Sequence, residues 1–113
     1  MSARLQRLAT FEEFWPFYVS QHSKSATRWL HFAGTSGAAA IVAAAFVFRR
    51  PVDASLAPFF AYGLAWFSHF AIEKNRPATF TYPLWSLRGD FRMFALMLRG
   101  RMSGEAARHL AGS

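Results

Sequence analysis

Two apolar stretches decide the fold: residues 29–48, WLHFAGTSGAAAIVAAAFVF, and residues 56–72, LAPFFAYGLAWFSHFAI. A helix of about 20 residues is about 30 Å long, which matches the hydrocarbon thickness of a bilayer. The second stretch is shorter, at the lower limit for a spanning helix, and it is also compatible with a buried helix. The segment between them, RRPVDAS at 49–55, combines charge with a helix-breaking proline. The sequence therefore predicts an all-α fold, an integral membrane helical hairpin.

Composition supports one membrane domain covering residues 1–113. The chain is 53% hydrophobic and has 13 phenylalanines, more apolar surface than so short a chain can cover with its own core. Lipid or a partner subunit must cover the remaining apolar surface. A homo-oligomer is therefore one possibility. The chain has no cysteine, which excludes disulfides and thiolate ligands. Any bound metal therefore needs histidine or carboxylate ligands.

The net charge of +7 is distributed around the apolar stretches. The basic residues are Arg4, Arg7, Lys24 and Arg28 before the first stretch, Arg49 and Arg50 between the two, and Lys74, Arg76, Arg88, Arg92, Arg99, Arg101 and Arg108 after the second. By the positive-inside rule we expect both termini in the cytoplasm, at the inner membrane if the chain is bacterial. The charge accompanies no nucleic-acid motif, which favours acidic lipid headgroups as the partner. The N-terminus also lacks the pattern of a cleaved signal.

Amphipathic helices are expected on both sides of the hairpin, at the membrane interface. Thr10 and Glu13 have the spacing of a capping box, and four aromatic residues follow at helical spacing: Phe11, Phe14, Trp15 and Tyr18. The sequence leaves open whether this face lies in lipid or packs under the hairpin. Asp90 is a candidate N-cap for a helix through about Leu98, ahead of a basic tail over about 100–113.

One histidine lies near the start of the first apolar stretch, and another lies near the end of the second. His31 is near the start of the first, while His69 and Glu73 end the second, four residues apart and so on one helix face. In an antiparallel hairpin these ends lie side by side, with His22 just before them. Ionisable groups at the membrane are functional candidates. We therefore predict a site of His22, His31, His69 and Glu73, although a single histidine at a helix end can also be structural.

Three segments carry a resemblance to a known family. They are FWPFY (14–18) leading to His22, RWLHFAGT (28–35), and AWFSHFAIEKNRPA (65–78). Together they resemble the Mpo-type 2-hydroxy fatty acid dioxygenase family, most specifically in the His-x-x-x-Glu-Lys followed by Pro-Ala. The resemblance implies an integral membrane, iron(II)-dependent enzyme of fatty acid α-oxidation. Such an enzyme cleaves a 2-hydroxy fatty acid with dioxygen to an acid one carbon shorter, with His22, His31 and His69 as metal ligands.

Further roles follow under the same hypothesis. Glu73 either ligates iron or orients His69. Arg28 or Arg76 holds the substrate carboxylate, although ordinary cytoplasmic flanking charge is the simpler interpretation of both arginines. The fatty-acyl tail lies between the apolar helices. Small residues in the first stretch, such as Gly34, predict close helix packing.

Two other functions remain open. The first is a noncatalytic membrane adaptor or lipid-binding protein, which would hold no stoichiometric metal. The second is a haem-binding electron-transfer protein with His31 and His69 as axial ligands.

Overall fold

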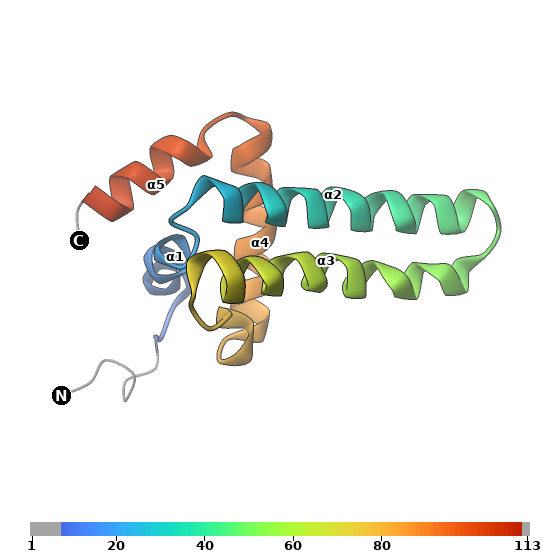
Figure 1. The fold of residues 1–113 in the computed structure, drawn as a ribbon, viewed down its shortest axis with the longest axis horizontal. Helices are drawn as coiled ribbons and strands as arrows, with labels where there is room; N and C mark the ends of the chain where they lie inside the picture. Colours follow the sequence, from blue (N-terminus) through green and yellow to red (C-terminus); the bar gives the residue numbers. More distant parts are fainter. Residues whose placement is uncertain (1–7, 112–113) are drawn as a thin grey trace.

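The computed structural model describes residues 8–111, and over that range every regular element is a helix (Figure 1). The elements are α1 (Phe11–Ser20), α2 (Ser25–Val47), the 3-10 helix η2 (Pro51–Ser55), α3 (Leu56–Phe67), the π-helix η3 (Ser68–Glu73), the 3-10 helix η4 (Ala78–Phe80), α4 (Pro83–Leu98) and α5 (Met102–Ala111). Arg4 and Arg7, and the last two residues of the basic tail, lie outside the described residues.

The molecule extends 52 × 30 × 27 Å. Helices α2 and α3 run antiparallel and project together from the rest of it (Figure 1). They approach each other closely because small residues face across the pair. A Cβ added at Gly34 would lie 3.2 Å from the carbonyl oxygen of Ala61. The expected close packing of this small-sided helix is therefore present, and η2 makes the turn at the far end.

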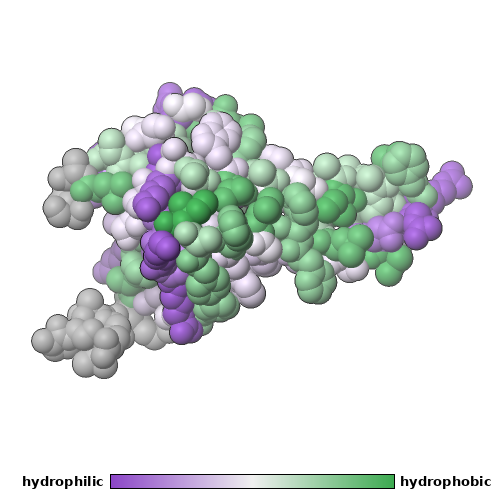
Figure 2. Space-filling view, viewed as in Figure 1, coloured by the Kyte–Doolittle hydropathy of each residue, from purple (hydrophilic) through white to green (hydrophobic). Residues whose placement is uncertain are grey.

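One helix among the described residues, α2, is long and apolar enough to cross a membrane. The second apolar stretch does not meet that criterion, because its α-helix has 12 residues and continues as the π-helix η3. Only 17% of the apolar part of α2 is buried within the protein. Figure 2 shows hydrophobic side chains along the projecting hairpin and hydrophilic ones at its tip. This helix is thus unlike the buried core helix of a soluble protein.

The protein core lies in the body at the other end, between α1, α4 and α5. Its buried side chains are Phe11, Phe14, Trp15, Tyr18, Val19, Ala78, Met93, Met102 and Ala106. The aromatic face of α1 is therefore covered by protein, and this settles the alternative that the sequence left open: α1 does not offer that face to lipid. Thr10 caps the helix as predicted, because the Glu13 N–H donates to Thr10 Oγ1 at 3.1 Å. The Glu13 carboxylate accepts from the Ala9 N–H at 2.9 Å, one residue before the N–H that a capping box uses.

Helix α4 begins earlier than expected. Pro83 occupies its first turn, where a fixed φ angle and a missing N–H suit a helix start. Asp90 consequently lies inside α4, and the prediction that it caps a helix is wrong. Its carboxyl group instead accepts a hydrogen bond from the Tyr18 hydroxyl.

Candidate metal centre

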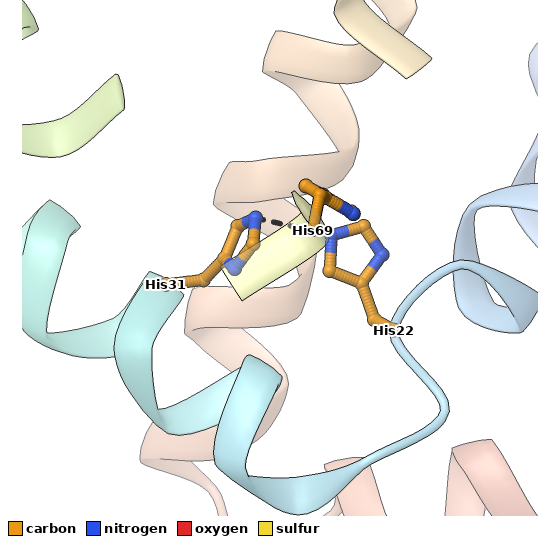
Figure 3. A group of neighbouring side chains, drawn as sticks. All are labelled: His22, His31 and His69. Atoms are coloured by element: carbon orange, nitrogen blue, oxygen red, sulfur yellow. Dashed lines mark hydrogen bonds between the residues drawn. The ribbon is translucent and has the colours of Figure 1, made fainter. Parts of the chain in front are cut away.

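Three histidine rings meet where the hairpin joins the body (Figure 3). His22 follows α1, His31 lies in the second turn of α2, and His69 lies in η3. Their ring centroids are 4.5 to 5.0 Å apart, and each pair is arranged edge to face. All three are buried, and one nitrogen of each lies within 4.8 Å of the others. A single chain therefore assembles the group without a second subunit.

Hydrogen bonds determine which nitrogen of each ring faces inward. His22 Nδ1–H donates to the Tyr18 carbonyl at 2.6 Å, and His31 Nδ1–H donates to the Thr27 carbonyl at 2.9 Å. His69 Nδ1 lies 2.7 Å from the amide oxygen of Asn75. Because carbonyl and amide oxygens only accept, Nδ1 carries the proton in each ring. The Nε2 lone pairs are thus available, which is the arrangement of metal-binding histidines.

The spacing of the Nε2 atoms suits a cation. His22 Nε2 and His31 Nε2 are 3.1 Å apart, the separation of about 3 Å expected for two imidazoles bound to one metal at about 2.1 Å. Burial, and after it His31 and His69, lowers the pKa of His22 well below its usual value. The ring is therefore neutral at pH 7, and two neutral nitrogens facing each other repel unless a cation binds between them. The donor set fits a divalent transition metal.

The His69 ring is held by the irregular end of the hairpin. The helix widens to a π-helix at Ser68 and ends at Lys74, whose φ of 61° is left-handed. This conformation brings the Asn75 N–H to the His69 carbonyl at 2.9 Å, while Asn75 Nδ2 donates to the Gln21 carbonyl at 3.2 Å. Asn75 therefore ties His69 to the segment before His22. Sequence reasoning assigned it no role; its one signal was its place in the motif.

Glu73 lies outside the histidine group. One of its carboxylate oxygens accepts from Ser23 Oγ at 2.8 Å and the other from the Lys24 N–H at 2.7 Å. Burial raises the pKa of Glu73, but the hydrogen bonds that the carboxylate accepts, including those from Lys24 and Ser23, outweigh burial and lower the pKa overall. The carboxylate thus caps the start of α2 and ties the end of the hairpin to it. Asn75, rather than Glu73, contacts the His69 ring.

The two arginines expected at the substrate carboxylate are engaged elsewhere. Arg28 is buried and donates to the His22 and Ser23 carbonyls at 2.8 and 3.0 Å. The Arg76 guanidinium lies over the Phe80 ring, 5.1 Å from its centroid. Neither is among the residues that line the two cavities beside the site. Arg28 instead holds the turn that carries His22.

An apolar cavity of about 540 Å³ adjoins the site. It lies between α2, α3 and α4, and alanines form much of its wall. His31 lines it at one end, and a second, small pocket continues past His31 to His69, with Tyr62 and Trp66 in its wall. Tyr62 and Trp66 thus lie beside the site. A long apolar ligand placed here would present one end to the histidines.

The geometry does not favour haem. Axial histidines leave the equatorial plane to the porphyrin. Here a third imidazole, His22, lies as close to His31 and His69 as they lie to each other. It would occupy part of that plane.

These features define an all-helical protein with a buried three-histidine group that can bind a metal ion, next to an apolar cavity. The chain belongs to the 2-hydroxy-palmitic acid dioxygenase Mpo1-like family, whose model matches residues 8–102. The family predicted from the sequence is thereby confirmed, and its name indicates a dioxygenase-related function in lipid metabolism. Comparisons with curated proteins and with solved structures gave no match.

Proposed function

We propose that this protein is an iron(II)-dependent membrane dioxygenase that shortens 2-hydroxy fatty acids by one carbon, with His22, His31 and His69 as the iron ligands. The observation that carries the proposal is the convergence of one nitrogen from each of the three rings, while Nδ1 of each ring lies against a carbonyl or amide oxygen. Three protein ligands leave open positions for substrate and dioxygen. When bound, iron(II) supplies the activation of dioxygen that the reaction needs.

The overall conversion is balanced with dioxygen alone. A 2-hydroxy acid and one dioxygen give an acid one carbon shorter, carbon dioxide and water, with cleavage of the bond between C1 and C2. In this scheme the chain's own residues position the reactants. Asn75, the Thr27 carbonyl and the Tyr18 carbonyl hold the three rings, and Glu73 and Arg28 hold the segments that carry them.

The apolar cavity is the proposed site of the alkyl tail. Its volume is in the range of about 300–1,000 Å³ that is usual for small-molecule sites. Its walls come from Thr35 through Ala43 on α2 and from Ala57 through Ala65 on α3. A tail lying there would place its acid end at His31. Membrane lipids are the proposed source of the substrate.

The hairpin is the proposed membrane anchor. Its exposed residues include Phe46, Val47, Phe48, Val52 and Phe59, and lipid would cover them. In this orientation the histidine group lies at the cytoplasmic boundary and both termini are cytoplasmic, with basic residues of the body near acidic headgroups.

Turnover by the iron-loaded protein tests the proposal. Protein purified without oxygen in detergent and supplied with iron(II) should convert 2-hydroxypalmitate and oxygen to pentadecanoate and carbon dioxide. His69→Ala should abolish product formation. The matched control is His109→Ala, because His109 lies on α5 and contacts Glu105 at 3.0 Å, away from the site. Folded, iron-loaded protein that forms no shortened acid would favour a lipid-binding protein instead.

A further inference from the structure

Asp90 lies where the two cavities meet. Four residues line both of them: His31, Tyr62, Ala65 and Asp90. Among the described residues that line either cavity, Asp90 has the one carboxyl group. A ligand that fills the apolar cavity and reaches the histidines therefore passes this side chain.

The Asp90 side chain is held in place by Tyr18. The Tyr18 hydroxyl donates to Asp90 Oδ1, and the Tyr18 ring, fully buried, stacks on His22 with 4.0 Å between centroids. Glycine at position 89 makes room for that ring, since a Cβ there would lie 2.8 Å from it. Asp90 and a proposed iron ligand are thus positioned by the same tyrosine.

The other Asp90 oxygen, Oδ2, has no hydrogen-bond partner among residues 8–111. A carboxyl group facing an apolar cavity is costly unless a polar partner meets it there. In agreement, burial raises the pKa of Asp90 to about 7. Above about pH 7 the group is therefore mostly ionised, and the hydrogen bond from Tyr18 to Oδ1 leaves Oδ2 as an acceptor for a ligand.

We propose that Asp90 is a positioning residue that accepts a hydrogen bond from the 2-hydroxyl group of the substrate and so selects 2-hydroxy acids over unsubstituted fatty acids. This inference rests on the proposed function. A fatty acid without the hydroxyl group leaves the Asp90 oxygen unpaired in a site that has excluded water. Sites built to pair with a hydroxyl group reject the analogue that lacks it, often strongly.

Binding measured without turnover tests the inference. Iron-loaded protein in detergent, kept free of oxygen, is titrated with 2-hydroxypalmitate and with palmitate by calorimetry. We expect the wild type to bind the hydroxy acid at least about tenfold more tightly. Asp90→Leu should bring this ratio close to one through weaker binding of the hydroxy acid, with palmitate bound as well as before. The matched control is Leu84→Ala, which lies on the same helix, is 79% exposed and lines neither cavity, and it should keep the ratio.

Two further variants keep the test decisive if Asp90→Leu does not fold. Asp90→Asn retains an acceptor for the Tyr18 hydroxyl and should lose only part of the preference. Tyr18→Phe frees the carboxyl group and should lower the ratio while iron binding persists. An unchanged ratio in these variants overturns the role of Asp90 and leaves the proposed function standing. A wild type that binds neither lipid overturns the proposed function, and this inference with it.

Discussion

The body and the hairpin of this protein bury apolar side chains in different ways. In the body, aromatic residues from α1 pack against α4 and α5, and Phe14 is 0% exposed. In the hairpin, alanine and glycine let two helices touch, while Phe59 is 78% exposed. The body thus has its own core, whereas the hairpin presents an apolar surface that lipid can cover. The histidine group lies at the junction, so its geometry depends on both regions.

The sharpest test of this difference compares two phenylalanines. Phe14→Ala removes a fully buried ring and should lower the free energy of unfolding by about 3–5 kcal/mol. Phe59→Ala should change it by less than about 0.5 kcal/mol and mainly weaken binding to lipid vesicles. Denaturant unfolding in mild detergent and vesicle flotation measure the two effects. Equal losses of stability would contradict the division between body and hairpin.

Two glycines test the close contact within the hairpin. Gly34→Leu forces a side chain against the Ala61 backbone and should destabilise the protein by about 1–3 kcal/mol. Because His31 lies one turn away on α2, metal affinity should fall as well. Gly63→Leu is the matched control, since a Cβ at that position meets nothing within 4 Å. Thermal unfolding of both variants measures the two losses of stability. Equal losses would show that the contact between the helices at Gly34 has no special role.

Asn75 tests how the end of the hairpin holds the site. Asn75→Leu removes the acceptor for His69 Nδ1–H and should weaken metal binding about 10- to 100-fold. Asn75→Asp keeps an acceptor oxygen and should retain most of the affinity. Competition titrations with iron(II) under nitrogen measure both. If the leucine variant binds metal as tightly as the wild type, the orientation of His69 has another source.

Glu73 should have a smaller effect, on stability rather than on metal binding. Glu73→Gln should cost about 0.5–1 kcal/mol at neutral pH, because it removes the charged cap of α2. Since the pKa of Glu73 is lowered in the folded protein, its stabilisation is complete above the ordinary glutamate pKa and is lost as pH falls through the lowered value. The free energies of unfolding of the wild type and of Glu73→Gln should therefore converge as the pH is lowered from 7 to 3. A constant difference would exclude this role.

The sequence predicted the elements that depend on local pattern and simple topology. Apolar length gave the two helical stretches, and their antiparallel pairing placed His31 near His69. The sequence pattern could not predict the contacts of Glu73, because the partners of its carboxylate, Ser23 and Lys24, are 50 and 49 residues away in the chain. The burial of α1 likewise depends on α4 and α5. Asp90 was misjudged because a good N-cap residue also occurs inside helices when a buried tyrosine holds it.

X-ray absorption at the iron edge of anaerobically loaded protein tests the central claim most directly. The account predicts one iron per chain with nitrogen or oxygen ligands near about 2.1 Å and outer-shell scattering from three imidazoles. His22→Ala should reduce the scattering to that of two imidazoles, whereas His109→Ala should leave it unchanged. Wild-type protein that is folded yet binds no iron, or binds it with no imidazole scattering, would contradict the account.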